Sequence, residues 1–101
     1  MQNVKIAEMA ERFDRIYNVH WEHFHQFALV YYLQNQDKTI LDDYNMPHDV
    51  KEALLAWGGK NARQYLKEEA PDMGGATLED LTKTATGIKA LKSLLIEITS
   101  H

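Results

Sequence analysis

Apolar side chains recur at intervals of three and four residues from Val4 to about Asn35, the longest regular pattern in the chain. At 100° per residue they fall within about 120° of arc, the width of the buried face of an amphipathic helix. The residues on this apolar face are Ile6, Met9, Ala10, Phe13, Ile16, Tyr17, His20, Phe24, Phe27, Ala28 and Tyr31. The pattern therefore predicts one long helix over residues 4–35.

Part of this face also repeats every seven residues. One series is Ile6, Phe13, His20 and Phe27, and a second series three residues later is Met9, Ile16, His23 and Val30. A sustained seven-residue repeat is typical of helices that pair in bundles or coiled coils. Beyond residue 28 the helix is apolar nearly all round, which indicates that other helices or a second chain enclose it.

The length of this helix favours pairing. A helix of this span is about 45 Å long, whereas a compact domain of this size has a radius of gyration of about 13 Å. No Pro or Gly lies within residues 4–35 to cause a kink. We therefore predict a homodimer formed through this helix. The side chains expected at its interface are Phe13, Tyr17, His20, Trp21, Phe24, Phe27, Tyr31 and Tyr32.

Shorter helices are predicted over residues 40–44, 47–57 and 62–70. Thr39 and Asp42 have the spacing of a capping box, and Pro47 suits the first position of a helix. The pair Gly58-Gly59 is typical of a helix C-terminus and predicts a break near residues 58–60.

The last helix is predicted over residues 77–99. Thr77 and Asp80 form a second capping-box pattern. Its apolar face spans about 160° of arc, so the helix should lie centrally and touch at least two neighbours. Gly87, in the middle of this helix, indicates close approach of another backbone. The fold class expected is all-α, a small helical bundle that forms one domain over residues 1–101.

Composition narrows the possible classes of protein. The 101 residues are 45% apolar and include no cysteine, which excludes disulfides, thiolate zinc sites and cysteine nucleophiles. No run approaches the ~18 apolar residues of a membrane span, and the N-terminus lacks the apolar segment of a signal peptide. We therefore expect a cytoplasmic protein that does not bind membranes. The net charge of −4 is spread along the chain, which argues against direct binding to nucleic acid.

No set of residues in the sequence has the pattern of a catalytic site. Serine occurs only at Ser93 and Ser100, which argues against a serine hydrolase. The glycine pairs at 58–59 and 74–75 lack the spacing of a phosphate-binding loop. We therefore predict that the protein is not an enzyme and uses no cofactor.

Histidines gather between residues 20 and 25. His20, His23 and His25, with Glu22, are candidate metal ligands, and Glu22 and His25 have the Glu-x-x-His spacing of di-iron bundles. However, no second such step exists in the chain. The run over residues 20–25 resembles the first helix of mini-ferritins, but the chain is too short for their four long helices.

His20 lies at the centre of the apolar face. We expect it to be a core or interface histidine that forms a hydrogen bond with Tyr17, Tyr31 or a facing side chain. In a homodimer it would meet its counterpart and fix the register. Charging both imidazoles would then loosen the dimer below about pH 6.

A second ridge on the flank of the helix consists of Trp21, His25, Ala28 and Tyr32. We interpret it as the seat of a neighbouring helix in the same chain, with a partner-binding ridge as the alternative. Three lysines of the last helix, Lys83, Lys89 and Lys92, are expected to form a solvated face.

The function predicted is that of a small protein–protein interaction module, such as an adaptor, an inhibitor or a regulator. It would act as a homodimer and bind another protein. Chains of this size and composition are common among accessory proteins of phages and mobile elements. The alternative is a metal- or ligand-binding helical bundle or sensor that uses the histidine cluster.

Overall fold

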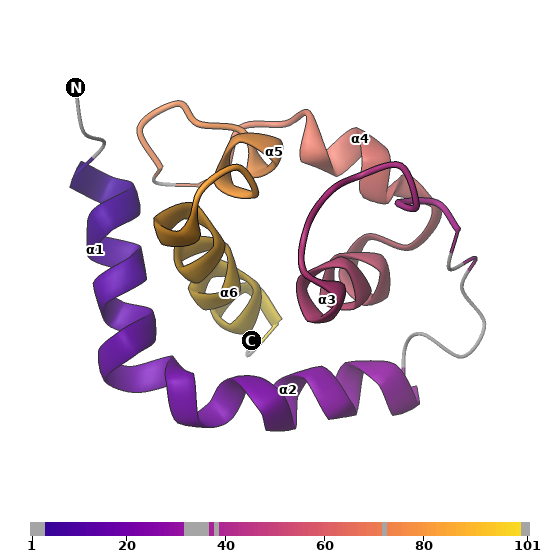
Figure 1. Ribbon diagram of the computed structural model, residues 1–101, viewed down its shortest axis with the longest axis horizontal. Coiled ribbons are helices and arrows are strands. Elements are labelled where there is room, and N and C mark those ends of the chain that lie inside the picture. The colour runs from indigo at the N-terminus through magenta and orange to yellow at the C-terminus, as the bar shows by residue number, and fades with distance from the viewer. Residues whose placement is uncertain (1–3, 32–36, 38, 72, 100–101) are drawn as a thin grey trace.

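The N-terminal helical arm bends sharply in the computed structural model, whose described residues are 4–31, 37, 39–71 and 73–99 (Figure 1). Helix α1 spans Val4–Arg12 and helix α2 spans Asn18–Tyr31, and the π-helical segment η1, Phe13–Tyr17, joins them. A π turn inserts one residue into the helical hydrogen-bond pattern and is a recognised cause of sharp kinks. The prediction of one straight helix without a kink is therefore wrong, and its last residues, 32–35, lie outside the described residues.

The bend removes the length argument for pairing. The molecule has extents of 39 × 27 × 23 Å and a radius of gyration of 12.7 Å, close to the expected value. The arm wraps around the other helices instead of extending beyond them (Figure 1). Any proposal that the chain pairs must therefore rest on the chemistry of its surface.

The π segment also changes which residues face the core. Met9 and Ala10 of α1 and Phe13, the first residue of η1, are buried; beyond the segment, Trp21 and Ala28 are buried. The inserted residue turns the following side chains by about one position, or about 100°. The ridge predicted on the flank of the helix thus faces the core, and its interpretation as the seat of neighbouring helices agrees with the burial of Trp21 and Ala28.

Helix α3, His48–Gly58, begins after Pro47 and packs against α2. Residues 39–44 form successive turns instead of the predicted short helix, with the Asp42 amide donating to the Thr39 carbonyl and the Tyr44 amide to the Leu41 carbonyl. The amide and hydroxyl of Thr39 both donate to Asp37. The predicted break after α3 is confirmed. Gly59 has a positive φ of 56°, which glycine adopts readily, and it starts the 3₁₀ turn η2, Gly59–Asn61.

Helix α4, Ala62–Leu66, ends four residues earlier than predicted. The backbone beyond it pairs across the 71–75 loop instead of continuing the helix. The amide of Ala70 donates to the Ala76 carbonyl at 2.8 Å, and the amide of Leu78 donates to the Glu68 carbonyl at 3.1 Å. This pairing satisfies backbone groups that a longer α4 would have used.

The last predicted helix divides into α5, Leu78–Leu81, and α6, Ala85–Thr99. The Thr77–Asp80 capping box at the start of α5 is confirmed. The hydroxyl of Thr84 accepts from the Gly87 amide at 2.9 Å and starts α6. A Cβ on Gly87 would overlap the Leu81 carbonyl oxygen, so the predicted close approach of another backbone is also confirmed.

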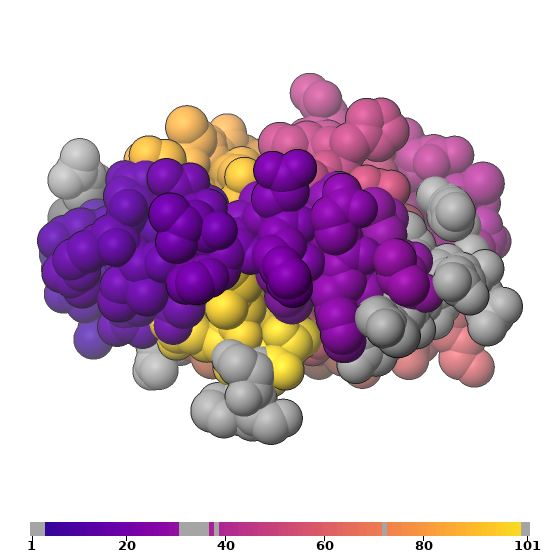
Figure 2. Space-filling model, turned by 90° about the horizontal axis from the view of Figure 1, so that it is seen from below, coloured from indigo at the N-terminus to yellow at the C-terminus, as the bar shows by residue number. Residues whose placement is uncertain are grey.

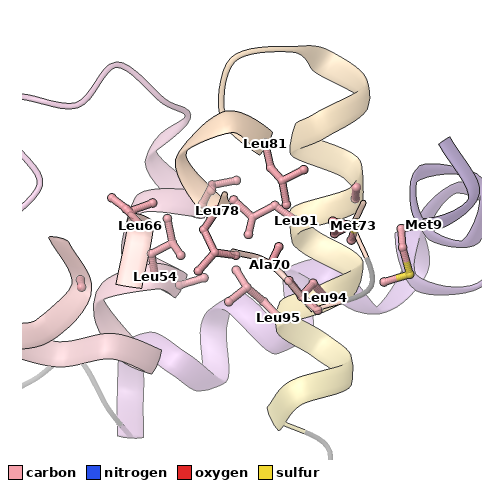
Figure 3. Packing of buried hydrophobic residues seen from close by; sticks show 14 of the residues in the cluster. Met9, Leu54, Leu66, Ala70, Met73, Leu78, Leu81, Leu91, Leu94 and Leu95 are labelled. Atoms are coloured by element: carbon pink, nitrogen blue, oxygen red, sulfur yellow. The ribbon is translucent and has the colours of Figure 1, made fainter. Parts of the chain in front are cut away.

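Helix α6 occupies the centre of the fold and packs against α1, α2, α3 and α5 (Figure 1). Figure 3 shows its leucines interleaved with Leu54, Leu66, Leu78 and Leu81. Leu91 and Leu95 have no exposed surface. The described residues form no strand beyond the isolated bridge between Glu69 and Thr77. The fold of this part of the chain is therefore all-α.

Candidate interaction surface

Helix α2 lies at the surface on the face of the molecule seen in Figure 2. Four large apolar side chains along α2 and the preceding segment η1 are exposed. Val19 is 82% exposed, Val30 51%, Phe27 46% and Ile16 45%. Together with exposed His23 they define the outer stripe: Ile16, Val19, His23, Phe27 and Val30. At 100° per residue the four members in α2, Val19, His23, Phe27 and Val30, lie within about a quarter of the helix circumference. Ile16 precedes them in η1.

The outer stripe keeps a seven-residue spacing. Ile16, His23 and Val30 are the later members of one predicted heptad series. The π segment turns this part of the repeat away from the core, while Met9 and Phe13 of the same pattern remain buried. The repeat that indicates pairing is therefore available on the surface.

A shallow hollow follows the same face. It has a volume of about 610 Å³ and is lined by Glu22, His23, Gln26, Phe27 and Val30. All of these residues belong to α2. The hollow is open and mixes apolar with uncharged and acidic groups, which suits a docked side chain more than a small reactant.

The inner face of α2 is held by directional contacts. The Trp21 indole donates to Asp49 Oδ2 at 2.8 Å, and His25 Nε2 lies 2.9 Å from Glu52 Oε1. The Lys92 ammonium lies 3.5 Å from Asp49 Oδ2 and 5.2 Å from the centroid of the Trp21 ring. Lys92 therefore packs inside this junction, and the prediction that it belongs to a solvated face is wrong.

The electrostatics of Asp49 reflect this packing. Burial raises the pKa of the carboxyl, but the hydrogen bond from Trp21 and the charge of Lys92 act in the opposite direction and leave the pKa below its ordinary value. The ionised carboxylate is thus stabilised where α2, α3 and α6 meet. This part of the arm is a structural junction within the chain.

The bend separates the histidines of the predicted cluster. His20 and His23 are exposed on the outside of α2, whereas His25 packs inward against Glu52 and stacks on Trp21. The expectation that His20 faces the core of its own chain is wrong, because the π segment rotates it outward. Within the described ranges, no three His, Cys, Asp or Glu side chains gather as a metal would require.

The other predicted interface residues divide in the same way. Phe13 and Trp21 are buried within their own chain, Tyr17 and Phe24 are half-buried, and Phe27 is exposed. The side chain of Tyr31 and all of Tyr32 lie outside the described residues. Sequence reasoning left out Val19, the most exposed apolar residue of the face. Its position three residues after Ile16 and four before His23 was the available signal.

A second groove lies between α1 and α6 and is lined by Lys5, Glu8, Met9, Arg12, Pro71, Leu94, Glu97 and Ile98. Arg12 forms an ion pair of 2.7 Å with Glu97, and the Tyr17 hydroxyl donates to the same carboxylate at 3.0 Å. The hydrogen bond to Glu97 raises the pKa of Arg12, and burial raises the pKa of Tyr17. These contacts to the Glu97 carboxylate hold α1 and η1 against α6.

The chain matches no protein-family model, no curated protein and no solved structure. In the part of the chain that the structure describes, no helix is long and apolar enough to cross a membrane. The functional argument therefore depends on the surface chemistry of the molecule itself.

Proposed function

We propose that this chain is a non-enzymatic protein–protein interaction module that pairs with a second copy of itself through the outer stripe of α2. The observation that carries the proposal is the exposure of the outer stripe, which is apolar except for His23, on a helix whose opposite face is already packed. Burying such side chains against a partner is favourable because it removes apolar surface from water.

The spacing of the stripe supports a helix as its occupant. Residues seven apart drift by only about 20° around a straight helix, so a second helix that coils slightly around the first stays in contact with all of them. A second copy of the outer stripe offers the same valine, isoleucine and phenylalanine side chains. A two-fold pair would also use one surface patch twice, as most homodimers do.

The size of the surface limits the strength of pairing. A stable interface buries about 800 Å² on each partner, and the 14 residues of α2 offer only one face of a short helix. We therefore expect a reversible dimer with a dissociation constant of about 1–100 µM. An obligate dimer would need more apolar surface than this face supplies.

Sedimentation velocity over a concentration series from about 1 µM to about 1 mM tests the proposal. The wild-type chain should shift from monomer to dimer, and Val19→Asp should remain monomeric because it places a charge in the stripe. Val4→Asp is the matched control, since Val4 is a 64% exposed valine on α1, away from the stripe.

Circular dichroism should show the same helix content in the wild type and in both variants. A wild-type monomer at the highest concentration would overturn the proposal. So would a Val4→Asp variant that weakens the dimer as much as Val19→Asp does, because pairing would then not depend on the outer stripe.

A further inference from the structure

His23 occupies the midpoint of the outer stripe. Ile16 and Val30, the ends of the stripe, each lie seven residues from it. Parallel pairing sets every residue against its own counterpart. Antiparallel pairing that overlaps the whole stripe is centred on its middle residue. In both orientations the His23 side chains of two copies face each other.

We infer that His23 lies on the two-fold axis of the pair and makes pairing sensitive to acid; this inference rests on the proposed self-association. Two neutral imidazoles can share a hydrogen bond, one as donor and the other as acceptor. Two imidazolium ions repel each other and lose hydration when apolar side chains close around them. Pairing is therefore favoured above the imidazole pKa and lost as the pH falls below it.

Other ionisable groups near His23 modify this response. In the described part of the chain the hollow around His23 is lined by α2 residues alone, and Glu22 is the charged one among them. His20 lies one turn away on the same exposed side. The carboxylate of Glu22, from either copy, attracts an imidazolium and opposes the loss of pairing. Glu22→Gln should therefore make the response to acid larger.

The size of the effect follows from proton linkage. An imidazole in water has a pKa of about 6.5. If only the doubly neutral pair associates, the dissociation constant rises about 100-fold between pH 7.5 and pH 5.5. If the pair tolerates one proton, the rise is about sixfold.

Sedimentation velocity of the full chain at pH 7.5 and pH 5.5 measures this change. The wild type should lose at least about sixfold in affinity at pH 5.5. His23→Gln keeps a polar side chain without a titrating group, so it should pair equally at both pH values. His48→Gln is the matched control, because His48 is an exposed histidine on α3, outside the stripe, and it should behave as the wild type.

The possible results distinguish a failure of the role assigned to His23 from a failure of self-association. Equal wild-type pairing at both pH values, or a response that persists in His23→Gln, would overturn the role of His23 while self-association stands. A response abolished by His20→Gln alone would also overturn it. Loss of helix at pH 5.5 in the wild type and His23→Gln alike would assign the response to folding and overturn it too. A monomer at pH 7.5 at every concentration would overturn self-association itself.

Discussion

Helices α1 and α2 share one seven-residue repeat, which faces the core in α1 and is exposed in α2. In α1 and at the start of η1 the repeat faces α6, and Met9 and Phe13 are buried there. In α2 the later members of the repeat are exposed, and another ridge, which includes Trp21 and Ala28, meets the core. A single π segment between the two helices accounts for the difference. A regular sequence pattern can therefore serve folding in one half of an arm and remain available for association in the other.

Both halves combine apolar packing with polar contacts, but the partners differ. Helix α1 lies close to α6, where the buried Ser93 hydroxyl donates to the Met9 carbonyl at 2.9 Å and Arg12 forms an ion pair with Glu97. The contact of α2 with α3 and α6 uses the indole of Trp21 and the charges of Asp49 and Lys92. Directional contacts of this kind fix the rotation of a helix more narrowly than apolar packing alone. This rotation decides which side chains of α2 face outward.

The largest expected effect distinguishes the inner from the outer aromatic residues of α2. Trp21→Ala should lower the free energy of unfolding by about 3–5 kcal/mol, because it leaves a cavity and removes the hydrogen bond to Asp49. Phe27→Ala, on the exposed side of the same helix, should cost less than about 1 kcal/mol. Urea denaturation of both variants at low protein concentration measures the difference. Equal losses would mean that the two faces do not differ as described.

The next effect concerns the close contact of α1 with α6. Ser93 is fully buried beside the α1 backbone, so Ser93→Leu should force the helices apart and cost about 1–3 kcal/mol. Ser93→Ala removes only the hydrogen bond to Met9 and should cost about 1 kcal/mol. Thermal unfolding monitored by circular dichroism compares the two. If Ser93→Leu stabilised the protein, the space between α1 and α6 would accommodate a larger side chain than serine.

A smaller effect tests the polar seat of α2. Asp49→Asn should cost about 1 kcal/mol at pH 7, because the amide keeps an acceptor for Trp21 but loses the charge that Lys92 faces. The pKa of Asp49 is lowered in the folded state, so its contribution is present above the unfolded pKa and is lost as the pH falls through the folded value. The deficit of Asp49→Asn should therefore narrow below about pH 4.

Urea titrations at several pH values measure this deficit. Asp42→Asn, at an exposed aspartate in the 39–44 turns, should change stability by less than about 0.5 kcal/mol and serves as the control. A deficit for Asp49→Asn that stays constant down to pH 3 would show that the charge of Asp49 contributes nothing.

The smallest effect belongs to the outer stripe. Val19→Ala should leave the monomer unchanged or stabilise it by a few tenths of a kcal/mol, because alanine has the higher helix propensity. The same variant should weaken pairing. A loss above about 1 kcal/mol in the monomer would mean that part of the chain covers Val19 and that the stripe is not a free surface.

Much of the fold could be predicted from local patterns. The capping box at Thr77, the break at Gly59 and the central position of the last helix are encoded by neighbouring residues and were correctly derived. The split between α5 and α6 was missed because Thr82 and Thr84 bond locally, through Thr82 Oγ1 to the Glu79 carbonyl and Gly87 to Thr84 Oγ1. Such side-chain bonds compete with helix hydrogen bonds without changing the apolar pattern.

Which side chains of α2 are exposed was harder to predict, because this depends on one inserted residue in η1. No Pro, Gly or change of periodicity marks η1 in the sequence. A continuous helix brings His20 and Phe27 to the core, and only the tertiary contacts of Trp21 and His25 favour the other rotation. Among the predicted interface residues, Phe13 and Trp21 are therefore buried in their own chain, whereas His20 and Phe27 are exposed.

The π segment can also be understood as an insertion. With one residue fewer between Phe13 and Tyr17, an uninterrupted α-helix would still bring Trp21, His25 and Ala28 onto the side that Phe13 occupies. The extra residue is thus not needed to align the inner face. Its contribution is the change of direction that carries this face from α6 around to α3 (Figure 1). Deleting one residue at this point would alter the shape of the molecule while its pattern of inward side chains stayed the same.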